Sequence, residues 1–269
     1  MQAQRPTGKV KLFLFLLFFM GIALNLLVPA HEKWGILGFL PFFSDEARPK
    51  NLEKHPFVES AKNGVVLIET FSTQAGVQGG SGTGFIVRPG YVATNAHVAM
   101  CLKDGRDFVN AEKIYVYSKG ERQEAEIEGL GAPNGSSQDM AVLKIRDTSM
   151  APLKLADSSK YQGVSGEQVL TIGFPFVDDL TEKDKPMVSS AGSLNYNGPA
   201  GLFYPSGTNF NHGNSGGPVF LTSTGLVVGL VVSYRPVSRD GVEIRSVDCV
   251  IPINTYKAFF RDKTGQQLG

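Results

Sequence analysis

A serine stands inside a glycine-rich stretch, GNSGGP, at residues 213–218. A serine hydroxyl becomes an effective nucleophile only when a base removes its proton and a third group holds that base in place. Glycine, asparagine, serine and proline are also the residues that any tight surface turn uses. The stretch alone is therefore compatible with a plain turn or with a nucleophile at Ser215, and the partners must be sought elsewhere in the chain.

The chain has four histidines, and their positions narrow the choice of a base. His97 follows a strand-like run in TNAHV, where we expect it to end a strand and open a short helix over residues 98–102. Two histidines lie in the N-terminal segment, and His212 is too close to Ser215 along a turn to reach its hydroxyl easily. A lone histidine is more often structural than catalytic. His97 is nevertheless the candidate base.

The third group should be a carboxylate that folding can bury beside His97. Asp139 stands directly before the apolar run MAVLKI, which would carry it to the edge of a core. An aspartate that caps a turn at the start of a strand is the alternative. Histidine, aspartate and serine in this chain order match one of three known orders of a catalytic triad, and the other two orders do not fit. The order favours joint catalysis by His97, Asp139 and Ser215.

The elements that must position these residues are short strands separated by turns. Apolar or alternating runs follow one another over residues 64–251, with the spacing of an antiparallel barrel or sandwich. We expect a hairpin at residues 88–90 and a helix after Pro252, where apolar residues recur with a helical period. Two stacked β-units of about ninety residues each fit this pattern, joined at residues 156–160.

The composition is that of an ordinary globular protein, with 269 residues, 42% of them hydrophobic, and a net charge of +1. No run of five or six basic residues occurs, so nucleic acid is not an expected partner. Two cysteines are too few for a disulfide scaffold or a four-ligand zinc site. We expect Cys101 and Cys249 to be separate thiols, with Cys101 packed in a helix.

The N terminus places basic residues before a long apolar run at residues 12–28. This is the layout of an export signal, and residues 28–30 offer a small-residue cleavage site. The run is only slightly shorter than the roughly 20 residues of a membrane span, so it could also remain as an anchor. We expect a signal peptide or membrane anchor at residues 1–30, a connector at residues 31–60, and a chain that works outside the cytoplasm.

Five stretches together resemble the protease domain of trypsin-type serine peptidases, in the HtrA/Deg branch: GSGTGFIV, TNAHV, DMAVLKI, LKLADSSKYQGVSGEQVLTIGFPF and GNSGGPV. The resemblance covers residues 64–260 and implies an all-β fold of two six-stranded antiparallel barrels with a C-terminal helix. The protease domain would span residues 61–262, divided at residue 155 into two barrels, with a tail at residues 263–269. The active site would lie in the cleft between the barrels.

By the same resemblance, His97 acts as general base and then general acid, Asp139 orients it, and Ser215 is the nucleophile. The oxyanion hole would be formed by Gly213, Asn214 and Ser215, since glycines let backbone N–H groups point at the place where the carbonyl oxygen becomes negative. The resemblance implies a serine endopeptidase that cleaves exported or envelope proteins in the periplasm or after secretion. Its mechanism needs no metal and no organic cofactor.

The chain departs from the family pattern in three ways. His212 stands where the family usually has proline, no PDZ peptide-binding domain is expected after the terminal helix, and the specificity pocket looks altered. By similarity, the residues around this pocket are Asn209, His212, Val231, Val232, Ser233 and Cys249. None of them is acidic, although Asp248 is adjacent. We therefore expect a small or medium apolar side chain before the cut.

Two other interpretations stay open. A catalytically silent fold of this type could bind peptides in the same cleft as a scaffold or chaperone, because family members gate their activity through the oxyanion loop. A protease that processes only itself is also compatible with the sequence. The complete set of three catalytic roles favours an active enzyme. The sequence does not indicate the oligomeric state.

Overall fold

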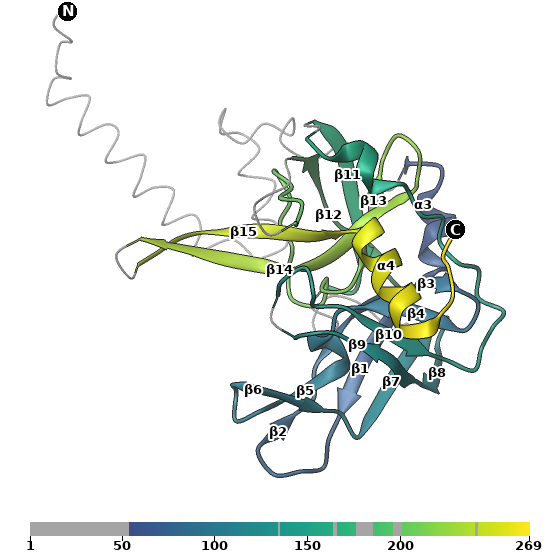
Figure 1. The fold of residues 1–269 in the computed structure, drawn as a ribbon, viewed down its shortest axis with the longest axis vertical. Coiled ribbons are helices and arrows are strands. Elements are labelled where there is room, and N and C mark those ends of the chain that lie inside the picture. The colour runs from purple at the N-terminus through teal and green to yellow at the C-terminus, as the bar shows by residue number, and fades with distance from the viewer. Residues whose placement is uncertain (1–53, 134, 164–165, 176–184, 196–200, 240–241) are drawn as a thin grey trace, which may run out of the picture. The chain divides into compact units, whose positions relative to one another are not determined.

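The computed structural model of the protein describes residues 54–133, 135–163, 166–175, 185–195, 201–239 and 242–269, without the side chains of residues 233–247 (Figure 1). The expected signal peptide or anchor and residues 31–53 of the expected connector lie outside the described residues. In the part of the chain that is described, no helix has both the length and the apolar character needed to span a membrane.

A seven-stranded antiparallel sheet forms the first half of the fold, in the order β8-β7-β1-β3-β4-β10-β9. Its strands are β1 (Val65–Phe71), β3 (Ser81–Arg88), β4 (Tyr91–Thr94), β7 (Lys113–Ser118), β8 (Glu121–Glu124), β9 (Glu126–Leu130) and β10 (Ala141–Lys144). Strand β1 is buried on both faces because Val65 and Leu67 enter one core cluster while Val66 and Ile68 enter another.

A five-stranded sheet of order β12-β11-β13-β14-β15 forms the second half. It contains β11 (Glu167–Gly173), β12 (Met187–Leu194), β13 (Pro218–Leu221), β14 (Val227–Arg239) and β15 (Val242–Pro252). A three-stranded sheet of β2 (Val77–Gln78), β5 (Met100–Lys103) and β6 (Asp107–Asn110) lies beside the first. The mostly-β architecture with two curled sheets confirms the expected fold, although the described strands divide as seven, five and three.

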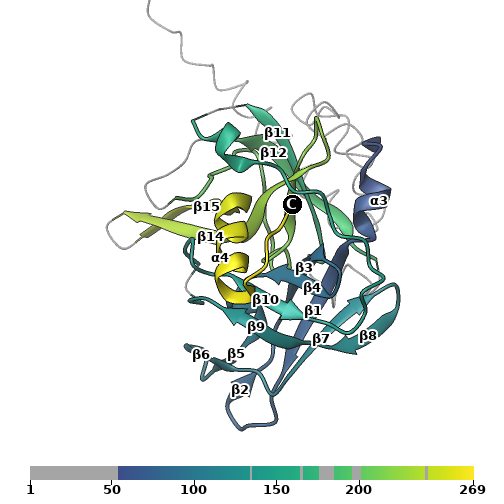
Figure 2. The same ribbon diagram turned by 45° about the vertical axis from the view of Figure 1, so that its right-hand side comes forward.

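The C-terminal helix is confirmed as α4 (Ile253–Thr264), which runs two residues past the predicted end of the domain. It packs across β9, β14 and β15 in both views (Figures 1 and 2). Tyr256 is fully buried, and its hydroxyl donates to the carbonyl oxygen of Ala141 over 3.0 Å. Gly265 ends the helix in the left-handed conformation, with φ +69°. This helix therefore ties the end of the chain to β10 in the first sheet.

The remaining helices differ from the sequence-based prediction. The helix expected over residues 98–102 is wrong: a 3-10 helix, η3, covers only His97–Ala99, and β5 follows it directly. Cys101 therefore lies in a strand, where it pairs with Val109. A short helix, α3 (Val58–Lys62), precedes β1. A 3-10 helix, η4 (Ser158–Tyr161), follows β10 and precedes β11 along the chain.

The largest buried cluster joins the two large sheets. It contains Leu67 and Phe85 from the first sheet, and Leu170 and Phe220 from the second, all 0–1% exposed. The expected β3–β4 hairpin is confirmed, with Gly90 at φ +80° in its turn. Beyond the core, β14 and β15 continue as a two-stranded ribbon that projects from the rest of the described fold (Figures 1 and 2).

Candidate active site

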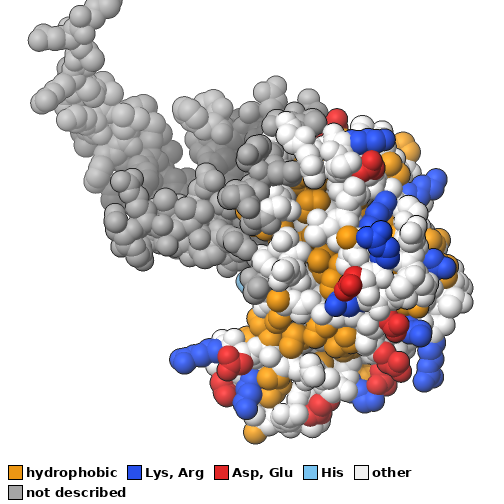
Figure 3. Space-filling model, in the orientation of Figure 1, with side chains coloured by type: hydrophobic (Ala, Val, Ile, Leu, Met, Phe, Trp, Pro, Cys, Tyr) orange, Lys and Arg blue, Asp and Glu red, His pale blue; other side chains and the backbone are white. Residues whose placement is uncertain are grey.

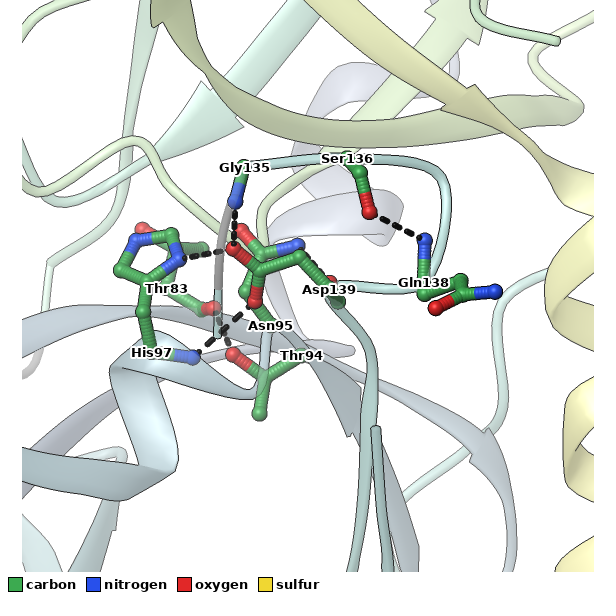
Figure 4. A network of polar contacts seen from close by, with 8 residues as sticks. All are labelled: Thr83, Thr94, Asn95, His97, Gly135, Ser136, Gln138 and Asp139. Carbon is green, nitrogen blue, oxygen red and sulfur yellow. Dashed lines mark hydrogen bonds and ion pairs between the residues drawn. The ribbon is translucent and has the colours of Figure 1, made fainter. Parts of the chain in front are cut away.

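His97 and Asp139 form a hydrogen-bonded pair at the end of two neighbouring strands (Figure 4). Strands β4 and β10 are antiparallel, with Ala141 opposite Thr94. Continuing this register beyond the strand ends brings Asp139 beside residues 95–97. Nδ1 of His97 lies 2.8 Å from Oδ2 of Asp139, and the backbone N–H of His97 donates to Oδ1 over 3.0 Å.

The carboxylate of Asp139 is fully buried, so its charge requires hydrogen-bond donors. Gly135 N–H donates to Oδ2 over 2.7 Å, in addition to the two contacts from His97. The side chain of Asn95 donates to the backbone carbonyl of Asp139 over 2.8 Å. The His97 side chain is 23% exposed, so one edge of the ring remains open to the surface. This arrangement fixes the ring and makes Nδ1 the donor, which leaves Nε2 as the acceptor.

Ser215 lies in a turn whose glycines cannot be exchanged without strain. Gly213 has φ +93° and Gly216 has φ +80°. A Cβ on Gly213 would meet the carbonyl oxygen of Phe174, and one on Gly216 would meet the carbonyl oxygen of Thr83. Both positions therefore need glycine for two reasons, the left-handed backbone and the close approach of neighbouring carbonyl groups.

Hydrogen bonds anchor this turn to both large sheets. The N–H of Thr83 on β3 donates to the carbonyl of Ser215 over 2.9 Å, and the N–H of Gly216 donates to the carbonyl of Val231 on β14 over 2.8 Å. The N–H of Asn214 donates to the backbone carbonyl oxygen of Asn211 over 3.0 Å. In contrast, no described group accepts a hydrogen bond from the N–H of Gly213 or of Ser215. Asn214 N–H is thus engaged inside the turn, and we confine the proposed oxyanion hole to Gly213 and Ser215.

His97 and Ser215 line one cavity of about 440 Å³. The residues around it are Gln78, Gly79, Gly80, Ser81, His97, Val98, Met100, Leu102, Phe108, Phe210, Asn211, His212, Ser215 and Val231. Between the described atoms of the two catalytic candidates, no hydrogen bond joins the Ser215 hydroxyl to the imidazole. Catalytic hydrogen bonds are often long in a protein without substrate and shorten when substrate binds.

Only some of the predicted pocket residues face this cavity. His212 and Val231 line it, whereas Asn209, Val232 and Cys249 do not. Val232 and Cys249 are fully buried in the core, and the N–H of Asn209 donates to Ser190 over 2.8 Å. The side chain of Ser233 is outside the described part. The prediction missed Phe210 and the β5–β6 hairpin, which also line the cavity.

Asp248 approaches the same region from β15. Its carboxylate accepts the backbone N–H of Phe210 over 3.2 Å, so it supports the segment that leads to the Ser215 turn. Burial raises the pKa of this carboxyl, and the hydrogen bond from Phe210 offsets part of that rise. Asp248 does not line the cavity. Asp248 is therefore connected to the cavity only indirectly, through its hydrogen bond to the backbone of Phe210, which lines the cavity.

Cys101 is the nearest thiol along the chain to His97, but it is fully buried on β5. Burial raises the pKa of this thiol, which disfavours the nucleophilic thiolate. The two cysteines are separate thiols, as expected. Among the described residues, no group of His, Cys, Asp and Glu side chains is arranged to hold a metal ion.

The chain is similar to known proteins in sequence and in fold. The family described as "Trypsin-like peptidase domain" matches residues 82–230. Putative protease Do-like 13 of Arabidopsis thaliana is 29% identical over 233 residues, 78% of this chain and 42% of that protein. A probable periplasmic serine endoprotease DegP-like of Pseudomonas savastanoi pv. phaseolicola is 36% identical over 150 residues, 55% of this chain and 28% of that protein. The chain thus spans less than half the length of these curated relatives.

Solved structures show the same fold. The serine endoprotease from Yersinia pestis aligns with a TM-score of 0.58 at 25% identity, over 78% of this chain and 65% of that chain. A protease from M. tuberculosis in its active form aligns with a TM-score of 0.56 at 21% identity, over 80% of this chain and 87% of that chain. The DegP-like relatives confirm the expected resemblance to the HtrA/Deg branch. Because the family match covers more than half of its length, the chain belongs to the family of trypsin-like peptidase domains.

Proposed function

We propose that this protein is a serine endopeptidase in which Ser215 is the nucleophile, His97 the general base and acid, and Asp139 the group that orients His97. The observation that carries the proposal is the double hydrogen bond from His97 to the buried carboxylate of Asp139, together with the cavity that His97 and Ser215 both line. A histidine held in this way presents Nε2 toward the cavity with the lone pair that a base requires.

The chemistry proceeds in two halves. The Ser215 hydroxyl oxygen bonds to the substrate carbonyl carbon while its proton passes to Nε2 of His97, and the negative oxygen is stabilised by the N–H groups of Gly213 and Ser215. The peptide C–N bond then breaks, and His97 returns the proton to the leaving nitrogen. Water, activated by His97, hydrolyses the acyl-enzyme and regenerates the serine.

The proposed substrates are polypeptides outside the cytoplasm. The apolar run at residues 12–28 and the printed names of the periplasmic DegP-like relatives support this location. Whether that run is removed or stays as an anchor is decided by N-terminal sequencing of the protein from its native host. A mature N terminus near residue 31 supports a cleaved signal, and an intact leader in the membrane fraction supports an anchor.

The proposal is tested by incubating the full chain with a diverse peptide mixture and identifying the products by mass spectrometry. We expect new termini that share a preference around the cut, with small or medium apolar side chains before it. The Ser215→Ala variant serves as the matched control and should give no new termini. Identical products from both proteins would reject Ser215 as the nucleophile.

A peptide-binding scaffold without catalysis is the second candidate. The observation that favours it is the missing hydrogen bond between the Ser215 hydroxyl and His97 in the described structure. In that case peptides should bind to the wild type and to Ser215→Ala with equal affinity, and neither protein should release products. Covalent labelling of Ser215 would exclude a permanently silent site.

A further inference from the structure

The β5–β6 hairpin gives the cavity an apolar wall. Met100, Leu102 and Phe108 all line the cavity. Leu102 pairs with Phe108 across the hairpin, and alternate residues of a strand share one face, so the three side chains lie on the same face of the small sheet. Cys101 points to the opposite face and is fully buried. One face of the hairpin therefore packs on the protein while the other borders the cavity.

Several local contacts hold this wall in place. Asp104 and Gly105 have φ values of +51° and +67°, the signs that a type I′ turn requires, and Arg106 N–H closes the turn onto Lys103 over 3.0 Å. Strand β5 pairs with β2 on its other edge. Charged side chains lie at the outer end of the hairpin, and hydrophobic side chains gather where it meets the body of the fold (Figure 3). The wall is thus formed before any substrate arrives.

The position of His97 indicates which residue of a bound substrate would contact the wall formed by Met100, Leu102 and Phe108. The Phe108 ring lies beside the imidazole, with ring centroids 6.3 Å apart. In the proposed reaction His97 must hand its proton to the nitrogen of the leaving fragment. The residue that carries this nitrogen therefore lies next to His97, and its side chain comes within reach of Phe108. Phe210, His212 and Val231 line the cavity from the second sheet.

We propose that Met100, Leu102 and Phe108 form a subsite for an apolar side chain on the residue that follows the cleaved bond, an inference that rests on the proposed function. Among the residues that the structure describes, no Asp, Glu, Lys or Arg lines the cavity, so a charged side chain would lose hydration there without gaining a partner from them. Phe108 is 38% exposed, and covering it with an apolar side chain removes apolar surface from water.

The test compares quenched peptides that are identical except for leucine, lysine or aspartate after the cut. For the wild type, kcat/KM should be about tenfold higher for leucine than for either charged residue. Phe108→Ser should remove most of this preference, and Phe108→Arg should shift it toward aspartate. Ile127→Ser is the matched control, because Ile127 is 36% exposed on β9 and lies outside the cavity. Its preference should equal that of the wild type.

Two further measurements separate the subsite from the proposed function. The rate of fluorophosphonate labelling reports the reactivity of Ser215, and it should be the same for the Ile127→Ser control and the wild type. The affinities of the same peptides for Ser215→Ala measure the preference for the residue after the cut without turnover, and the leucine peptide should again bind more tightly than the charged ones. Absence of labelling in the folded wild type would reject the protease but not the subsite. Equal affinities for leucine and lysine peptides, or a preference that survives Phe108→Ser, would overturn the subsite.

Discussion

The hydroxyl of Thr83 donates a hydrogen bond to the carbonyl oxygen of Gly213 over 2.6 Å, although the two residues are 130 positions apart in the chain. The same oxygen of Thr83 accepts the N–H of Phe174 over 3.0 Å. Thr83 is fully buried on β3, so the first sheet holds the peptide unit between Gly213 and Asn214, within the Ser215 turn. This contact orients the proposed oxyanion hole across the two halves.

Thr83→Val should therefore reduce turnover more than binding. Valine has nearly the same shape but no hydroxyl, so the Gly213 carbonyl loses its donor and the neighbouring N–H groups lose their orientation. We expect kcat to fall about tenfold to a hundredfold with KM little changed, somewhat less than the loss of a whole oxyanion donor. Thr83→Ser, which keeps the hydroxyl, should recover most of the rate. Steady-state kinetics that show wild-type turnover for Thr83→Val would contradict this role.

Gly213→Ala should damage the active site directly. The added Cβ would require a strained backbone at φ +93° and would meet the Phe174 carbonyl. We expect the rate of fluorophosphonate labelling to fall about a hundredfold to a thousandfold. Gly163→Ala is the control, because Gly163 also has positive φ but no atom lies within 4 Å of the added Cβ. That variant should label at the wild-type rate, and equal slowing of both variants would show a general effect of backbone strain.

Asp139→Asn should retain the fold but lose catalysis. The asparagine can accept from the backbone N–H of His97, yet it favours the imidazole tautomer with the proton on Nε2, which then cannot act as the base. We expect kcat/KM to fall by about 10⁴, the effect of the same change in a well-studied triad. Circular dichroism checks the fold. A loss of less than tenfold would mean that Asp139 does not set the tautomer of His97.

Asp157 should make stability depend on pH in the acid range. Hydrogen bonds from the Ser159 hydroxyl, from Asn254 and from the Ser159 N–H lower its pKa from 3.8 to about 2. Because the folded pKa lies below the unfolded one, its contribution is complete above about pH 4 and is lost as the pH falls through about 2. Urea unfolding at several pH values should show Asp157→Asn to be less stable at neutral pH, with the difference from wild type shrinking as the pH falls through about 2. A pH-independent difference would contradict this linkage.

The strands and the triad candidates were predictable because their signals are local. The β-rich pattern, the β3–β4 hairpin and α4 follow from alternation, turn residues and a helical period. The pairing of His97 with Asp139 depends on the β4–β10 register, which a single sequence does not show. The order of His97, Asp139 and Ser215 along the chain matches a known triad order, and this order predicted the pairing without knowledge of the register.

The two misjudged regions have physical explanations. A short apolar run does not distinguish a helix from a strand, and residues 98–102 were therefore predicted as a helix although most of them form β5. The Asp-Gly pair at residues 104–105 is typical of a hairpin turn and would have predicted the β5–β6 hairpin. Neighbouring residues of a strand face opposite sides, so Val231 and Val232 could not both line one pocket. The sequence does not show which of the two valines faces the cavity, because this depends on how each face of β14 packs against the rest of the fold.

Covalent labelling of Ser215 tests the central claim most directly, that His97, Asp139 and Ser215 act as one unit. The intact wild-type protein is treated with a fluorophosphonate, and the site of the added mass is located by peptide mapping. The account predicts one adduct on Ser215, none in Ser215→Ala, and labelling at least a hundredfold slower in His97→Ala, because the base is lost. Labelling of Ser215 at the wild-type rate without His97, or no adduct in the folded wild type, would contradict it.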